Sequence, residues 1–172
     1  MIGRNAFIAL AALAAGCTTM GMGDNPKAVA NLEATKGNSV TGRVTFVQES
    51  DGVHVNANVA GLPPNSEHGF HVHEKGDCSS GDGMSAGGHF NPDGKPHGPQ
   101  SAAHHAGDMP SLSADSYGNA TASFVLKSVT IGGGGADLVG KGLIVHRDAD
   151  DFTTQPTGNS GPRIACAVIV KS

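Results

Sequence analysis

The stretch VTGRVTFVQESDGVHVNANV, residues 40–59, decides the fold class. Both of its halves are rich in β-branched residues, and Ser50-Asp51-Gly52 between them is typical of a hairpin turn. In the second half every other residue is apolar, so one face of a strand can pack into a core while His54 faces away from it. The pattern predicts two antiparallel strands, over 40–48 and 53–59.

Around this hairpin, short apolar runs alternate with loops rich in Gly, Pro, Ser and Asp. We expect further strands, the first of them at a sheet edge, over residues 28–35, 68–74, 120–129, 142–146 and 164–170. Two long polar segments, 75–112 and 147–162, have few apolar residues, and loops this long in a compact domain are usually functional. The chain is therefore predicted to be an all-β sandwich or barrel of about eight short strands with two long functional loops.

The composition narrows the class of protein. The 172 residues fit one domain, and with 4% aromatic residues the core must be largely aliphatic. The 26 glycines favour many tight turns, which suits a β domain. The net charge of −4, without a long basic run, argues against a general nucleic-acid binder.

The N-terminus is typical of an export signal. Arg4 precedes a ten-residue apolar run, 6–15, which is too short to span a bilayer. Small residues then lead directly to Cys17, a pattern that resembles the bacterial lipobox. We expect a lipoprotein-type signal peptide over 1–16, cleavage before a lipidated Cys17, a flexible tether over 17–26 and the folded domain over 27–172. The alternative is ordinary signal cleavage nearby, with Cys17 discarded or left as a free thiol.

Export places the chain in the periplasm or cell envelope, where it would meet a membrane only through the lipid anchor. Such a compartment is oxidising, and without Cys17 the cysteines form one pair, Cys78 and Cys166. A disulfide between them would close a loop of roughly 90 residues, for which the chain-entropy model gives about 4 to 5 kcal/mol before strain is subtracted. Two buried free thiols are the alternative.

Histidine is over-represented, with nine residues in a chain that has no tryptophan. His71 and His73 are two apart on a predicted strand, so both rings project from one face. Alone, such a pair is a weak signal. One glycine- and proline-rich loop adds four donors that would form a closed zinc shell and order this polar loop: His89, His97, His105 and Asp108.

Six segments, in order, resemble the copper/zinc superoxide dismutases. They are Gly69-Phe70-His71-Val72-His73-Glu74, Gly88-His89-Phe90-Asn91-Pro92, His97-Gly98, His105-Ala106-Gly107-Asp108, Val145-His146-Arg147 and Gly161-Pro162-Arg163-Ile164-Ala165-Cys166. The resemblance extends from about residue 40 to 170. It implies an eight-stranded Greek-key β-barrel with an immunoglobulin-like arrangement, and one copper and one zinc per subunit.

The resemblance also implies a role for each residue. The copper ligands would be His71, His73, His89 and His146, and the zinc ligands His89, His97, His105 and Asp108. His89 would thus bridge both metals. Asp150 would link a copper-side and a zinc-side histidine, Arg163 would attract the anion beside the copper, and Cys78 and Cys166 would form the family's disulfide. For Asp150 and Arg163 the alternatives are an ordinary loop carboxylate and a structural arginine.

The implied activity is the disproportionation of superoxide to O2 and hydrogen peroxide, which would protect the cell envelope. Copper would alternate between two oxidation states, with His89 leaving copper on reduction and taking up a proton, while zinc would hold the loop. Steering of the anion is expected to draw on Lys75, Lys95 or Lys141. A homodimer and a monomer are both compatible with the sequence.

Two rival functions fit the sequence less well. A non-enzymatic metal-binding or copper-delivery domain of the same fold is expected to lack a copper ligand or the arginine, yet all of them are present. A zinc-only structural protein would leave His71, His73 and His146 without a purpose. The remaining histidines are expected to be a solvated strand residue, a framework residue and a neighbour of a zinc ligand, namely His54, His68 and His104.

Overall fold

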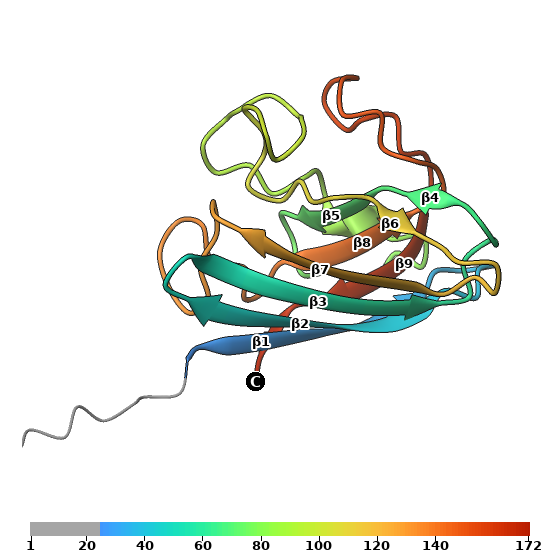
Figure 1. Ribbon diagram of the computed structural model, residues 1–172, viewed down its shortest axis with the longest axis horizontal. Helices are drawn as coiled ribbons and strands as arrows, with labels where there is room; N and C mark the ends of the chain where they lie inside the picture. Colours follow the sequence, from blue (N-terminus) through green and yellow to red (C-terminus); the bar gives the residue numbers. More distant parts are fainter. Residues whose placement is uncertain (1–24) are drawn as a thin grey trace, which may run out of the picture.

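The computed structural model describes residues 25–172 (Figure 1). The predicted signal peptide, Cys17 and most of the predicted tether lie outside the described residues. Within the described part, no helix is long and apolar enough to cross a membrane, and the one helical segment is the 3-10 turn η1 (Met84–Ala86).

The chain is an all-β protein built on one curled antiparallel sheet (Figure 1). The sheet order is β5-β8-β9-β1-β2-β3-β7, with β10 also paired to β1. The strands are β1 (Lys27–Ala34), β2 (Thr41–Glu49), β3 (Gly52–Ala60), β5 (Phe70–His73), β7 (Ala120–Leu126), β8 (Gly142–His146), β9 (Arg163–Val168) and β10 (Val170–Lys171). A second small sheet joins β4 (Glu67–His68) to β6 (Leu112–Ser113).

Nine of the ten segments correspond to the seven predicted ranges, because two of those ranges are interrupted. Gly69 separates β4 from β5, and Ile169 separates β9 from β10. The two-residue strand β6 lies at the end of the segment predicted as loop. The edge position predicted for residues 28–35 is wrong, since β1 pairs with β2 on one side and with β9 and β10 on the other.

The core lies between the two halves of the curled sheet. Along β3 the burial alternates, so that Val53, Val55, Ala57 and Val59 are buried as the sequence pattern predicts. By contrast, β5 and β8 are buried on both faces, because long loops cover their outer side. That second layer of buried side chains contains the histidines.

The two long loops lie together above the β5–β8 part of the sheet (Figure 1). A disulfide between Cys78 and Cys166 ties the first loop to β9, as expected. Around it, Ala86, Ile144 and the two half-cystines form a small apolar cluster separate from the main core. The buried histidines and this apolar cluster thus form a second interior between the sheet and its loops.

Candidate metal centre

Three of the candidate ligands project from adjacent strands. His71 and His73 lie on β5, and both rings enter the same cluster, as their spacing predicts. β5 pairs with β8, which ends at His146. The register between β8 and β9 shifts at His146, which then lies opposite Arg163. An irregularity of this kind can re-aim the side chains next to it, and the His146 ring lies with the β5 histidines.

The remaining candidates come from the first long loop. Isolated β-bridges pair His73 with His89 and His71 with Asp108, so the loop lies directly on β5. The seven residues form two sets of buried donors, each with ligand atoms within 4.8 Å of one another. We call them the strand group, which is His71, His73, His89 and His146, and the loop group, which is His89, His97, His105 and Asp108.

Three rings of the strand group, those of His71, His73 and His146, have one nitrogen fixed by an outer partner. His73 Nδ1 donates to the Gly87 carbonyl at 2.9 Å, and His146 Nδ1 donates to the Gly161 carbonyl at 3.0 Å. The other nitrogens, the Nε2 atoms of His73 and His146, are 3.4 Å apart. His71 Nε2 donates to Asp150 Oδ2 at 2.6 Å, which leaves its Nδ1 buried without a hydrogen-bond partner.

The loop group is arranged around Asp108. Its Oδ1 atom lies 2.8 Å from His89 Nδ1, 3.0 Å from His97 Nδ1 and 3.3 Å from His105 Nδ1. The Nδ1 atoms of His89 and His105 are 3.4 Å apart. The other Asp108 oxygen, Oδ2, accepts hydrogen bonds from the backbone of Gly98 and His105, so the carboxylate also holds the loop closed.

His89 is the one residue that belongs to both groups. Its Nδ1 faces the loop group, while its Nε2 is buried without a hydrogen-bond partner. The His89 ring centroid lies 4.0 Å from that of His71 and 5.5 Å from that of His105. One imidazole therefore offers a nitrogen to each side.

A second link between the groups is Asp150, on the loop that follows β8. Its Oδ2 accepts from His71 and its Oδ1 accepts from His97 Nε2 at 2.9 Å. Both side chains of each pair are fully buried. An outer carboxylate of this kind fixes the tautomer and orientation of a ligating imidazole, so Asp150 orients one histidine in each group.

Burial lowers the pKa of three rings of the strand group, those of His71, His73 and His146. Desolvation lowers the pKa of His71 to about 4, although Asp150 opposes the shift, and lowers the pKa of His146 to about 3. It also places the pKa of His73 well below the usual value. Neutral imidazole is the form that binds a metal, so these rings are ready for one throughout the neutral range.

Carboxylates give His97 in the loop group the opposite character, whereas burial lowers the pKa of His105. Burial would lower the pKa of His97, but the nearby carboxylates of Asp108 and Asp150 outweigh it and raise the pKa to about 9. Burial would raise the pKa of Asp108, but its contacts with His89 and His97 hold that pKa below its ordinary value. Without a metal, a proton on His97 compensates the buried carboxylates.

The donors fit the metals that the sequence suggests. Three imidazole nitrogens and one carboxylate oxygen are a typical zinc shell, and donors about 2.0–2.1 Å from a tetrahedral ion lie roughly 3.4 Å apart. The loop group is spaced at 2.8 to 3.4 Å. Four imidazoles suit copper, and two buried nitrogens of the strand group have no hydrogen-bond partner, His71 Nδ1 and His89 Nε2. Buried polar atoms without a partner are costly unless something binds them.

Arg163 lies beside the strand group on β9. Its guanidinium donates to the carbonyl of Gly83 at 2.6 Å and to that of Gly87 at 2.5 Å. The Gly87 carbonyl thus accepts from both Arg163 and His73. Both partners are uncharged carbonyls, so neither neutralises the guanidinium.

Of the three lysines predicted to steer an anion, Lys95 and Lys141 have other partners. Lys95 pairs with Asp93 at 2.9 Å, and Lys141 lies over the Phe90 ring at 4.6 Å. Instead, Lys36 lines an open cavity of about 380 Å³ together with Arg163 and Asp82. Lys36 follows β1, far before the arginine in the sequence, so no local motif could have revealed it.

The other histidines take the places expected of them. His68 is fully buried, and its Nδ1 donates to the carbonyl of His146 at 2.9 Å. His54 lies outside the core and pairs with Asp51 at 2.7 Å. His104 donates to the carbonyl of Ala102 at 2.7 Å, while its neighbour His105 enters the loop group.

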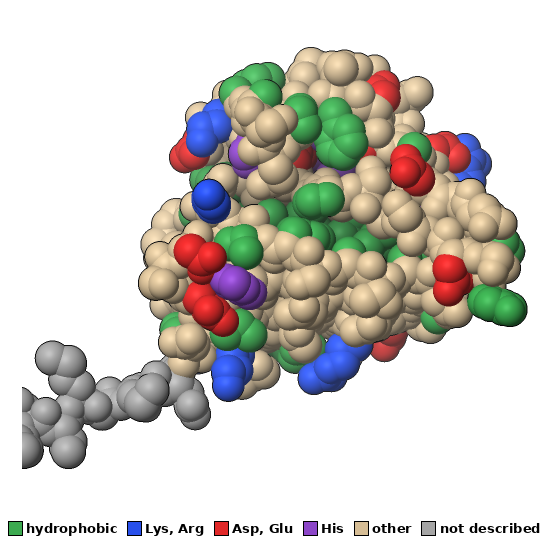
Figure 2. Space-filling view, in the orientation of Figure 1, with side chains coloured by type: hydrophobic (Ala, Val, Ile, Leu, Met, Phe, Trp, Pro, Cys, Tyr) green, Lys and Arg blue, Asp and Glu red, His purple; other side chains and the backbone are tan. Residues whose placement is uncertain are grey.

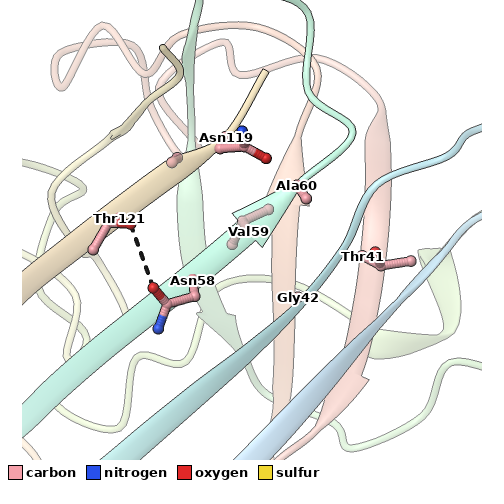
Figure 3. Close-up of a pocket in the computed structure, with 8 residues that line it drawn as sticks. Thr41, Gly42, Asn58, Val59, Ala60, Asn119 and Thr121 are labelled. Carbon is pink, nitrogen blue, oxygen red and sulfur yellow. Dashed lines mark hydrogen bonds between the residues drawn. The ribbon is translucent and has the colours of Figure 1, made fainter. Parts of the chain in front are cut away.

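A surface pocket elsewhere on the molecule is a poor candidate for chemistry. It is formed by β2, β3 and the start of β7, and Thr121 donates to Asn58 at its edge (Figure 3). Its lining contains no histidine and no charged side chain. The histidine groups lie instead beneath the loops, and little histidine surface is visible on the face drawn in Figure 2.

Comparisons with known proteins give the site a context. The sequence profile of the family described as copper/zinc superoxide dismutase (SODC) matches residues 40–169. The Cu-Zn superoxide dismutase 2 of Aquifex aeolicus (strain VF5) is 41% identical over 150 residues, which cover 83% of this chain and 86% of the relative. The Cu-Zn superoxide dismutase of Paramecium bursaria Chlorella virus 1 is 43% identical over 137 residues, with 76% and 72% covered.

Solved structures share the fold. A SOD-like protein from Bacillus subtilis superposes with a TM-score of 0.73 at 33% identity, covering 81% of this chain and 96% of that one. A protein described as the clock protein EA4 superposes with a TM-score of 0.77 at 39% identity, covering 87% and 97%. Both likenesses cover more than four fifths of this chain.

Proposed function

The chain belongs to the copper/zinc superoxide dismutase family, and we propose that the strand group holds copper, that the loop group holds zinc, and that the two together disproportionate superoxide. As a member of this family the chain is an oxidoreductase. The assignment of the individual residues is our proposal, with one copper and one zinc per subunit.

The observation that carries this proposal is the position of His89. It is buried between two sets of donors and presents one nitrogen to each. A shared imidazole places two metals at a fixed separation, which a single-metal site would not require. Asp150 supports the same arrangement, because it holds His71 in one group and His97 in the other.

Bound copper would supply one-electron redox chemistry that converts two superoxide anions and two protons to O2 and hydrogen peroxide, and bound zinc would keep the loop donors in place. The residues of the chain do the rest. Arg163 attracts the anion to the strand group, and His89 Nε2 can hold a proton there. The carbonyls of Gly87 and Gly161 keep two rings in the orientation that the strand group needs.

We further propose that the enzyme works in the periplasm or cell envelope, held by a lipid on Cys17, with residues 1–16 removed, 17–26 as a tether and 27–172 as the enzyme domain. The disulfide between Cys78 and Cys166 supports an oxidising compartment. Mass spectrometry of the mature N-terminus would test the lipid, and light scattering would distinguish a monomer from a homodimer.

The function is tested by metal analysis combined with superoxide turnover on the purified protein. We expect one copper and one zinc per chain and rapid turnover that a copper chelator abolishes. One copper and one zinc per chain without turnover would contradict the enzymatic function and would favour a metal-binding module of the same fold.

A further inference from the structure

The backbone of His97 is held by a single side chain from the other long loop. His97 lies in a segment without strands, and its peptide groups take no part in the backbone pairing of the described residues. Its N–H donates to Gln155 Oε1 at 2.8 Å, and its carbonyl accepts from Gln155 Nε2 at 2.9 Å. A side-chain amide has the same donor and acceptor as a peptide group, so Gln155 replaces a missing neighbouring strand.

The contact is one of three that this loop makes with His97. Asp150 accepts from the far nitrogen of the imidazole, and the Phe152 ring stacks parallel to it with centroids 6.4 Å apart. Asp150 and Phe152 act on the ring, whereas Gln155 alone acts on the main chain. The position of the ring's metal-facing nitrogen depends on both, because an imidazole oriented correctly on a displaced backbone would miss the ion.

We propose that Gln155 is a positioning residue for the zinc side, which sets how long the loop group retains zinc. The inference rests on the proposed function, since it takes His97 as a zinc ligand. It goes beyond it by making zinc retention depend on a residue of the 147–162 loop that contacts neither metal nor substrate. Zinc loss and opening of this loop are therefore linked.

Two substitutions, one that changes the length of the Gln155 side chain and one that changes its chemistry, test this proposal. The substitution Gln155→Asn leaves a side chain one methylene too short to reach both peptide groups, whereas Gln155→Glu keeps the length but loses the donor to the His97 carbonyl. A matched control is Gln48, which lies on β2 outside both donor groups. Its amide also holds backbone groups, the Ile131 N–H between β7 and β8 and the Gly52 carbonyl at the start of β3.

The experiment follows the release of zinc and of copper from the fully loaded full-length protein into a chelator for each metal. For Gln155→Asn and Gln155→Glu we expect zinc release to accelerate about tenfold, in the range found for outer partners of metal ligands, with copper release unchanged. Gln48→Asn should release both metals as the wild type does.

Two results would overturn the inference: zinc release from both Gln155 variants at the wild-type rate, or equal acceleration in the Gln48 control, which would indicate general loosening. A wild-type protein that binds no zinc would instead contradict the proposed function itself. Gln155→Glu preserves the shape of the side chain, so it provides a folded variant even where the shorter one is unstable.

Discussion

The strand group and the loop group are neighbours that share His89, yet they are built in different ways. Three histidines of the strand group stand on β5 and β8, inside a hydrogen-bonded ladder. The other donors of the loop group lie on a loop between strands, where the peptide groups of His97 have no backbone partner. Backbone carbonyls hold two strand-group rings, whereas carboxylates surround the loop group.

The difference shows how one fold can make two kinds of metal site. A rigid, neutral set of imidazoles can hold a metal that changes its charge, because the ladder keeps the donors in place. A set of loop donors with a buried negative charge is neutralised by a dication and ordered by it. On this proposal copper would occupy a preformed site, whereas zinc would order the donors of its own site.

The largest effect is expected from removing one donor from each group. His146→Ala should abolish copper binding and superoxide turnover while zinc stays bound, because the loop group is intact. His105→Ala should abolish tight zinc binding while copper still binds to the strand group. Metal analysis of both variants checks this, and loss of both metals from each of them would show that the two groups are not separable.

A smaller effect on metal binding is expected from a substitution of Asp150, which accepts hydrogen bonds from both groups. Asp150→Asn keeps the size of the side chain. Its amide nitrogen, however, is a donor and would face a ring nitrogen of His71 or His97 that also donates. We expect zinc affinity to fall by about 10- to 100-fold, and copper affinity to fall less because β5 still holds His71. Competition titrations measure both affinities. An equal loss of the two would contradict the contrast between strand and loop.

His71 and His146 on one side and His97 on the other should give the metal-free protein opposite dependences on pH. The pKa values of His71 and His146 are lowered to about 4 and about 3, so below pH ~6.5 the unfolded chain binds protons that the folded one does not, and stability falls as pH falls. The pKa of His97 is raised to about 9, so its contribution is complete below pH ~6.5 and is lost as pH rises toward 9.

Denaturant unfolding of the metal-free protein from pH 5 to 9 should therefore show greatest stability near pH ~6.5. The variant His97→Gln should flatten the alkaline side alone, because it removes the one ring whose pKa is raised in the loop group. A wild-type protein whose stability rises steadily from pH 6.5 to 9 would be incompatible with a protonated His97.

The smallest effect is expected on kcat/KM, from changing the charge of a lysine near the path of the anion to the strand group. Lys36 shares a cavity with Arg163, while Lys95 is paired with Asp93. At low ionic strength we expect Lys36→Glu to lower kcat/KM by about two- to fivefold and to weaken its salt dependence, with Lys95→Glu as the control of equal charge. If the two variants behave alike, the cavity at Arg163 is not the entry that matters.

Much of the fold follows from sequence periodicity, because strands with one buried face alternate visibly, as β3 does. The edge position predicted for β1 is wrong because β1 also pairs with β9, which comes near the end of the chain. The disulfide could be predicted by counting cysteines, because Cys78 and Cys166 are the pair that remains once Cys17 is set aside.

The donors of the candidate site were visible as residue types, but their supports were not. The carbonyls of Gly87 and Gly161, the amide of Gln155 and the charge of Lys36 belong to residue types found in any loop. Their roles exist only once the two loops are folded together over β5. Spacing in the sequence carries no information on that packing.

The central claim is that His89 is shared between copper and zinc. A crystal structure of the loaded protein, with anomalous diffraction recorded at the copper and zinc absorption edges, tests it most directly. We expect copper among His71, His73 and His146, zinc among His97, His105 and Asp108, and a nitrogen of His89 bonded to each. Two ions with His89 bonded to only one of them, or a single ion, would contradict the account.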